Sequence, residues 1–285
     1  MKTGHGGARE GVAVGLNSGQ IGLGELEGGL GPGMRENRGR RICDYEGSAY
    51  RTEFWGAGRE YEDRVERAAL ERMLPPRGRR LIDIGGGYGR LMPMYSGYDE
   101  VVIFDYARSQ LRQGQELWGD QGPGGGPRIR YVAGDFYRLP FAASSFDTVI
   151  VVRTLHHATD APRVLRGIAE ILAPGGTLVL EFANKRNLKA MVRYGVGRQE
   201  WSPWAREPVE FVELNFDFHP AWVEEQLNRV GLAVEARRAV STFRVGLLKR
   251  TVPTGVLVGL DRLWQPLGGV VPVSPSVFLR CRAEG

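Results

Sequence analysis

The sequence predicts an α/β fold built on a parallel, doubly wound sheet. A short apolar strand at 81–84 runs into a glycine-rich turn at 85–89 and then into a helix. A second apolar run ends at Asp105. It lies about 20 residues after Asp83, the separation at which an acid in nucleotide-binding α/β folds meets ribose hydroxyls. A third acid, Asp135, follows the next strand. Acids at three successive strand ends, beside a glycine turn, indicate a site for a nucleoside cofactor.

The spacing of the glycines restricts the kind of cofactor. Gly85, Gly87 and Gly89 allow backbone dihedrals that are closed to other residues, and they let a ligand approach the main chain. A dinucleotide fingerprint G-x-G-x-x-G would need a third glycine where the chain has Arg90 or Met92. The sequence also lacks G-K-[ST], so it contains no Walker loop. The pattern that remains is D-x-G-x-G-x-G.

This pattern resembles motif I of the class I S-adenosylmethionine (SAM)-dependent methyltransferases, which have a Rossmann-like fold. Further segments resemble the family's later elements in the family's order: the ribose-binding strand at 101–107, the G-D-x-x-x-L-P-F segment at 133–141, the fourth strand at 145–152, and a helix, L-x-P-G-G turn and fifth strand at 165–181. Together these elements cover residues 80–182. The closest likeness is to the small-molecule branch called methyltransferase type 11, which includes the quinone methylases.

The resemblance implies a doubly wound sheet of seven strands, mostly parallel with strand seven antiparallel, and helical insertions between strands five and seven. Strands six and seven are expected at 232–240 and 276–280, and a helix with Val65 and Ala69 on one face is expected at 61–74. The expected organisation is a disordered glycine-rich tail at 1–40, an N-terminal cap over the cofactor pocket at 41–78, and a SAM-binding domain at 79–285, with substrate-side insertions at 183–218 and 243–273.

The cofactor implied by the resemblance is SAM, with S-adenosylhomocysteine as product. The glycine turn would admit the methionine and ribose portions, Asp83 would help orient them, and Asp105 would hold the ribose hydroxyls. Asp135 and Phe136 would hold adenine. Asp147 begins a strand and is therefore interpreted as structural. The full expected cofactor-binding set is Asp83, Gly85, Gly86, Gly87, Gly89, Asp105, Tyr106, Asp135, Phe136 and Arg153.

Candidate catalytic residues follow strand four. His156 and His157 lie where a base could reach the methyl group, and histidine suits that role because its unperturbed pKa is near neutral. The alternative is that both histidines only shape the loop and the cofactor pocket. Arg153 could orient an acidic acceptor or merely bond the loop. No metal site is predicted, because the cysteines match no zinc pattern.

Composition limits the partners. The net charge of +5 comes partly from the N-terminal tail and from scattered arginines, and the basic runs at 35–41 and 77–80 are short, which is more typical of a solvated surface than of a nucleic-acid site. Nucleic acid is therefore an unlikely partner. Residues 153–157 also replace the N/D/S-P-P-Y/F segment of the base-methylating enzymes, which favours O- or C-methylation of a small-molecule or lipid-like acceptor. The sequence leaves the oligomeric state open.

The insertion at 243–273 mixes apolar and basic residues. Two interpretations of this insertion are open: a buried lid helix, or peripheral contact with a membrane surface. The lid helix is favoured, because glycines and prolines interrupt any long amphipathic face. The chain shows no secretory signal and no apolar run of about 18 residues, so a cytoplasmic location is expected.

Alternatives to a methyltransferase remain at this stage. A SAM-binding scaffold without turnover would keep the same acids and glycines. Another SAM-derived group transferase on this fold, such as an aminopropyl transferase, would favour an acidic amine pocket after strand four, which Arg153 opposes. A redox enzyme is disfavoured by the glycine spacing.

Overall fold

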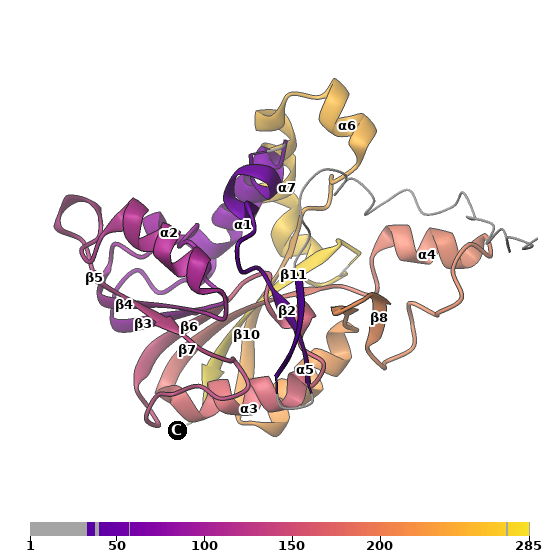
Figure 1. Ribbon diagram of the computed structural model, residues 1–285. Coiled ribbons are helices and arrows are strands. Elements are labelled where there is room, and N and C mark those ends of the chain that lie inside the picture. The colour runs from indigo at the N-terminus through magenta and orange to yellow at the C-terminus, as the bar shows by residue number, and fades with distance from the viewer. Residues whose placement is uncertain (1–32, 38–39, 57, 272, 285) are drawn as a thin grey trace, which may run out of the picture.

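A computed structural model describes residues 33–37, 40–56, 58–271 and 273–284, and its centre is one seven-stranded sheet (Figure 1). The strand order is β10-β11-β7-β6-β3-β4-β5. Only β11 runs antiparallel to its neighbours, which confirms the predicted topology. The strands are β3 (Gly78–Ile84), β4 (Tyr98–Asp105), β5 (Arg128–Ala133), β6 (Phe146–Val151), β7 (Leu172–Ala183), β10 (Leu232–Val240) and β11 (Ser276–Ala283).

Helices cover both faces of the sheet because successive side chains of each buried strand point to opposite faces. In β3, Ile82 packs in the core beneath α3 and α5, whereas Leu81 packs in the core beneath α1, α2 and α7. Parallel strands that are buried on both faces read as continuous apolar runs, as these strands do. The covering helices are α1 (Glu60–Met73), α2 (Arg108–Trp118), α3 (Ala161–Ile171), α5 (Pro220–Arg229) and α7 (Thr254–Gly268).

Local sequence signals set several of these boundaries. Asp160 caps α3 by accepting a hydrogen bond from the Arg163 backbone N–H, and His219 caps α5 through its Nδ1 atom. Gly231 follows α5 with a φ of +71°, a conformation that favours glycine. Asp147 accepts hydrogen bonds from the backbone N–H groups of Arg79 and Arg80 at 2.6 and 3.0 Å, which confirms its structural role.

The predicted N-terminal tail needs a correction. Residues 33–37 form β1 (Gly33–Asn37), which pairs antiparallel with β2 (Arg40–Asp44), so the expectation of disorder is wrong for this part of 1–40. The pairing of β1 with β2 gives backbone N–H and C=O groups of both strands hydrogen-bond partners, and the composition of the segment did not predict this pairing. Residues 1–32 lie outside the described part of the chain.

The two insertions carry their own elements. The insertion at 183–218 contains α4 (Leu188–Gly195) and the paired strands β8 (Val209–Val212) and β9 (Asn215–Asp217). The insertion at 243–273 contains α6 (Gly246–Thr251) and α7. Among the described residues, none of the helices combines the length and apolar character that crossing a bilayer requires. Short helical turns complete the chain: a π-helical turn η1 (Tyr50–Phe54) and the 3₁₀ turns η2 (Met92–Met94), η3 (Pro123–Gly125) and η4 (Leu155–His157).

A buried polar contact fastens α7 to α1. The Tyr61 hydroxyl donates to Asp261 Oδ2 at 2.6 Å and accepts from the Phe243 backbone N–H at 3.0 Å. Both Tyr61 and Asp261 are almost fully buried. The Gln265 amide also donates to the Val65 carbonyl at 3.0 Å. One side of α7 is therefore part of the core, which fits the lid-helix interpretation for that side.

Removing the Tyr61 hydroxyl should lower the free energy of unfolding. Tyr61→Phe would leave the buried Asp261 carboxyl and the Phe243 N–H each with one partner fewer, at a cost of about 1–3 kcal/mol. Urea unfolding measures the change. Tyr194→Phe is the control, because Tyr194 is exposed and its ring contact with Trp204 survives the change. Equal stability of both variants would contradict this account of how α7 is held.

Candidate functional site

The site lies where the carboxyl ends of β3, β4, β5 and β6 meet. From β3 the chain winds outward through β4 and β5, then returns to the opposite side of β3 as β6. Loops leaving β3 and β6 diverge at this reversal, and ligands of open α/β sheets bind in the resulting crevice. The predicted acids and glycines fall at this edge because each of them ends a strand or follows one.

Two adjoining cavities occupy the crevice. The larger one holds about 810 Å³ of empty space, part of it open to solvent, and is lined by Gly87, Asp105, Asp135 and Phe136, among others. The smaller one has a volume of about 390 Å³ and is lined by Asp83 and by other residues of the first strand and turn. Both cavities share four lining residues: Tyr50, Gly85, Gly87 and Arg153.

The glycine turn forms the floor between the two cavities. Gly85 has a φ of +75° and packs so closely that a Cβ atom there would collide with the Thr154 side chain. At Gly87, with a φ of +54°, a Cβ would meet only Asp105 Oδ2, at 3.9 Å, so this position opens into free space. Gly89 instead packs against Met92 and Trp118, which gives it a structural role in the turn.

Backbone donors fix the acid at the end of β4. Asp105 Oδ2 accepts a hydrogen bond from the Gly87 N–H at 2.9 Å, and Oδ1 accepts from the Ala107 N–H at 2.8 Å. Burial raises the pKa of Asp105 to about 6, while these hydrogen bonds oppose the shift. The carboxyl group is thus held rigidly at the wall of the larger cavity, with lone pairs to spare for hydroxyl donors.

Asp83 serves the smaller cavity. Its Oδ2 atom accepts a hydrogen bond from the Tyr95 hydroxyl at 2.7 Å, and only 2% of the residue is exposed. Burial raises the pKa of Asp83 to about 6. Asp135 lies in the wall of the larger cavity, where its Oδ1 atom accepts from the Tyr137 N–H at 2.9 Å. The structure therefore brings Asp105 and Asp135 together around one cavity and places Asp83 at the other.

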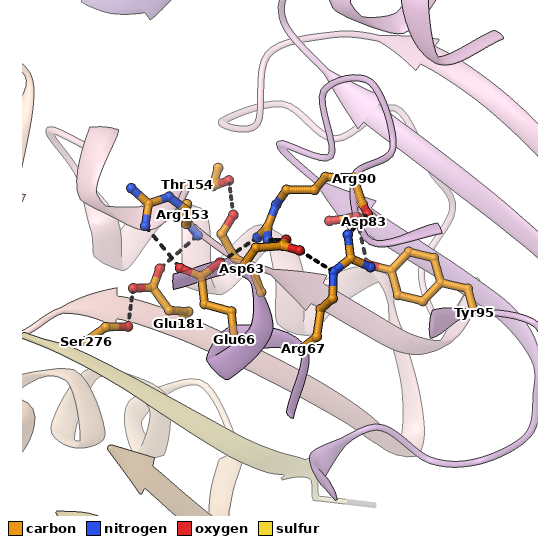
Figure 2. A network of polar contacts seen from close by, with 11 residues as sticks. Asp63, Glu66, Arg67, Asp83, Arg90, Tyr95, Arg153, Thr154, Glu181 and Ser276 are labelled. Atoms are coloured by element: carbon orange, nitrogen blue, oxygen red, sulfur yellow. Dashed lines mark hydrogen bonds and ion pairs between the residues drawn. The ribbon is translucent and has the colours of Figure 1, made fainter. Parts of the chain in front are cut away.

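The sequence reasoning missed a buried ion network (Figure 2), two members of which, Arg90 and Arg153, line the smaller cavity. Glu66 of α1 contacts Arg90 at 2.6 Å through one carboxylate oxygen and Arg153 at 3.1 Å through the other. Glu66 has a side-chain exposure of 2%. The Arg153 backbone N–H also donates to Glu181 at 2.8 Å, and Ser276 donates to the same carboxyl at 2.6 Å. Arg153 adopts a φ of +56°, a rare conformation that these contacts hold in place.

The two candidate histidines have different surroundings. The Nδ1 atom of His157 lies 2.9 Å from the Leu214 carbonyl, which can only accept, so Nδ1 carries the proton. The Nε2 atom then accepts from the Tyr45 hydroxyl at 3.2 Å. Burial lowers the pKa of His157 to about 4, and burial also lowers the pKa of His156, whose ring is tilted by 47° against that of His157 with centroids 3.9 Å apart. His157 is thus a neutral, fixed part of the wall of the larger cavity.

Residues before α1 complete both cavities. Ile42, Cys43 and Tyr45 line the larger one, and Tyr50 lines both. Phe54 and Trp55 follow Tyr50 in the chain, and the Trp55 ring lies over the Arg90 guanidinium, 3.9 Å from the ring centroid. The aromatic density of this segment was a sequence signal. Glu66 also had a sequence signal, because it is an acid next to Val65 on the buried side of α1.

Part of the chain is similar to a known protein family. Residues 82–180 match the family model described as a methyltransferase domain. The ubiquinone/menaquinone biosynthesis C-methyltransferase UbiE of Idiomarina loihiensis is 36% identical over 112 residues, which are 38% of this chain and 44% of that protein. The chain thus spans less than half the length of the curated relatives it matches.

Solved structures share the fold over a longer stretch. A methyltransferase of Haloferax volcanii, solved with its activator protein, superposes with a TM-score of 0.57 at 18% identity, over 83% of this chain and 97% of its own. The magnesium protoporphyrin IX methyltransferase of Synechocystis, solved with bound S-adenosylhomocysteine, has a TM-score of 0.52 at 16% identity, over 80% of this chain and 84% of its own. At these identities the likeness concerns the fold.

Neutralising Glu66 should destabilise the protein. Glu66→Gln would leave Arg90 and Arg153 partly buried without the charge between them, at a cost of about 3 kcal/mol or more. Chemical unfolding gives the free energy. Glu71→Gln on the same helix is the matched control, since Glu71 is exposed and its ion pair with Arg262 measures 3.7 Å. A loss no greater than that of the control would show that the network contributes little.

The raised pKa values of Asp83 and Asp105 predict how stability depends on pH. In the window from roughly pH 4 to 6 the folded state holds these protons and the unfolded state releases them, so stability falls as pH rises. Asp83→Asn should remove one such group and flatten the slope by up to about 1.4 kcal/mol per pH unit. Urea unfolding across this window tests it, with exposed Asp99→Asn as control. Parallel slopes for wild type and Asp83→Asn would contradict the assignment.

Proposed function

Residues 82–180 belong to the class I SAM-dependent methyltransferase family, and from this premise we propose that the chain transfers a methyl group from SAM to a small-molecule or lipid-like acceptor. One observation carries the proposal. The larger cavity combines an open glycine floor at Gly87 with Asp105 at the end of β4 and with Asp135 and Phe136 after β5. Asp105 offers a carboxylate to a pair of hydroxyls, Asp135 offers an acceptor to an amino group, and Phe136 offers a ring for stacking.

The residues present fit SAM. The larger cavity is a concave site lined by apolar and aromatic residues with a few polar groups, as small-molecule sites usually are, and the adjoining smaller cavity gives room for a second polar portion. A Cβ at Gly87 would occupy the space between the two. In this assignment Asp105 receives the ribose hydroxyls, Asp135 and Phe136 hold adenine, and Asp83 faces the methionine portion. Gly85, Gly86 and Tyr106 supply the surrounding wall.

Methyl transfer from SAM requires little of the protein beyond aligning the acceptor with the methyl group. When bound, SAM supplies an electrophilic methyl group on a sulfonium that is already a good leaving group. The chain's residues must then hold the acceptor in line with that methyl group and exclude water. Tyr50, which lines both cavities, and Phe54, which stacks on it with ring centroids 4.9 Å apart, close the space above Arg153.

For the residues after strand four, the geometry supports positioning roles. Arg153 is anchored by Glu66 and Glu181, so its guanidinium has a fixed place at the junction of the two cavities. His157 keeps Nε2 occupied by Tyr45 and has a lowered pKa, which suits a wall more than a base. Proton transfer by His156 or His157 stays a prediction.

The acceptor class follows from the relatives and from the charges near Phe54. The matched UbiE proteins are named as C-methyltransferases of quinone biosynthesis, and we infer a related preference for carbon or oxygen acceptors on an electron-rich ring. The Arg59 guanidinium lies 3.8 Å from the Phe54 ring centroid and that of Arg153 lies 5.1 Å from it, so cations flank the position where an aromatic acceptor would enter. A cytoplasmic setting fits this proposal, since Cys43 and Cys281 are both free thiols.

Calorimetric titration with SAM, S-adenosylhomocysteine and NADH in parallel tests the cofactor. The first two should bind and NADH should not. Asp105→Ala should weaken the binding of S-adenosylhomocysteine by about 1–3 kcal/mol, because charge-assisted hydrogen bonds to the ribose are lost. Asp99→Ala, at an exposed position on the same strand, is the control.

Each outcome decides a separate point. Absence of binding by either sulfur nucleoside would overturn the proposal, and unchanged affinity in Asp105→Ala would remove the placement of the ribose. Release of S-adenosylhomocysteine in the presence of phenol and quinol acceptors then separates a methyltransferase from a scaffold that binds SAM without turnover.

A further inference from the structure

The exposed apolar side chains of this protein gather on the two insertions. Large apolar residues are exposed at fifteen positions among the described residues, and all but Leu117 and Val212 lie within 188–204 or 245–271. Leu263 is 74% exposed, and Val270 is 82% exposed. Scattered exposed apolar residues are ordinary, whereas a gathering of this kind marks an interaction surface. We call the exposed apolar side chains of these two segments the apolar face.

On α7 the apolar face is a helical stripe. Val256, Leu260, Leu263 and Leu267 follow one another at intervals of four, three and four residues, so they share one side of the helix. The core-facing side of α7 is a different set, which includes Leu257 and Val258 and the buried Asp261. A helix that is apolar on both sides is expected to be covered on both sides. Within the described residues, only one side of α7 is covered.

The α4 segment continues this face. The Leu188 backbone N–H, at the start of α4, donates to the Val273 carbonyl at 2.7 Å, which brings α4 next to the chain that leaves α7. Leu188, Val192 and Val196 are each more than half exposed. The helices α4 and α6 both stand out from the sheet, α6 at the top and α4 at the right in Figure 1.

Basic residues accompany the apolar ones. Residues 185–199 contain five basic and no acidic residues, and residues 242–271 contain four basic residues and one acid, the buried Asp261. Burial and the charges of Arg193 and Arg244 lower the pKa of Lys189, which shows that cations of the two insertions lie close together. Arg250 is exposed and follows the exposed Leu247 by three residues on α6, so the two lie on the same side of that helix.

We propose that the apolar face binds the surface of an anionic lipid bilayer, with Leu263 and its neighbours entering the interface and the surrounding lysines and arginines contacting the headgroups. Exposed apolar side chains flanked by cations are what such surfaces bind, and each basic residue near an anionic leaflet adds to the attraction. A second copy of the chain fits this face poorly. A twofold interface would set the same cations against themselves.

The position of the apolar face relative to the cavities suits the delivery of a lipid-like acceptor. Lys249 of α6 donates to the Gly58 carbonyl at 2.9 Å and contacts Glu62 of α1 at 2.9 Å. Tyr50, in the segment before α1, lines both cavities, so α6 contacts the same part of the chain that contributes to the site. If the proposed methyl transfer holds, a lipid-like acceptor would move from the bilayer to the site over a short path. The binding itself does not rest on that activity.

Flotation of the full chain with vesicles tests the proposal. One set contains phosphatidylcholine alone and the other also contains about 30% phosphatidylglycerol. The protein should float with the anionic vesicles, and less of it should do so in about 0.5 M salt, where headgroup charges are screened. The variant Leu263→Gln/Leu267→Gln should reduce the affinity by about tenfold or more. Lys189→Gln/Arg250→Gln should remove the preference for anionic vesicles.

Matched controls isolate the face. Leu117→Gln on α2 changes an exposed leucine elsewhere, and Arg166→Gln on α3 changes an exposed arginine elsewhere, so both should float as wild type does. Affinity for S-adenosylhomocysteine should be the same in every variant, which shows that they fold and separates this test from that of the cofactor. Failure of the wild type to float, or equal flotation of Leu263→Gln/Leu267→Gln, would overturn the proposal. A dimer in solution that this double change abolishes would also overturn it, because the occupant would be a second copy.

Discussion

The site depends on one carboxylate, that of Glu66, which lies between two arginines from different strand ends. Arg90 follows the glycine turn after β3, and Arg153 follows β6, so these cations would repel one another across the crevice without the acid. A buried ion pair is not by itself a source of stability, because desolvation offsets the attraction. Its effect here is positional: it fixes α1 against the two loops whose divergence creates the crevice. Glu66 binds the guanidinium of Arg153, while Glu181 binds the backbone N–H of the same residue, which has an otherwise unfavourable φ.

Around that anchor, carboxylates from different strand ends line the two cavities. Asp105 and Asp135 line the larger cavity together with Phe136, Asp83 and Arg90 line the smaller one, and Arg153 lines both. Burial raises the pKa of both Asp83 and Asp105 to about 6, so these carboxyls are poorly solvated before any ligand arrives. Hydroxyl or ammonium donors from a ligand would supply the interactions that water no longer provides. Preorganised acceptors of this kind favour binding, because the protein does not need to reorder on contact.

The sequence predicted the parts of the molecule that depend on local patterns. Strand six was expected at 232–240 and β10 has those bounds, and the helix expected at 61–74 is α1 within one residue at each end. The glycine turn and the strand-end acids could be placed together because topology brings strand ends to one edge. The Glu66 network could not, since its partners lie 24 and 87 residues away and only the packed sheet brings them within reach. Residues 33–37 were missed for the same reason: their β pairing is not encoded in apolar periodicity.

Glu62 and Glu66 of α1 connect the α6 insertion with the residues around the cavities. They are four residues apart on α1, so they lie on one side of the helix in successive turns. Glu66 holds the arginines of the cavities, whereas Glu62 holds Lys249 of α6 and lies 3.5 Å from Arg244. Both carboxylates have a side-chain exposure of 2%, so each binds its cations where water screens them little. The cations of α6 and the arginines that line the site are thus bound by carboxylates on successive turns of one helix.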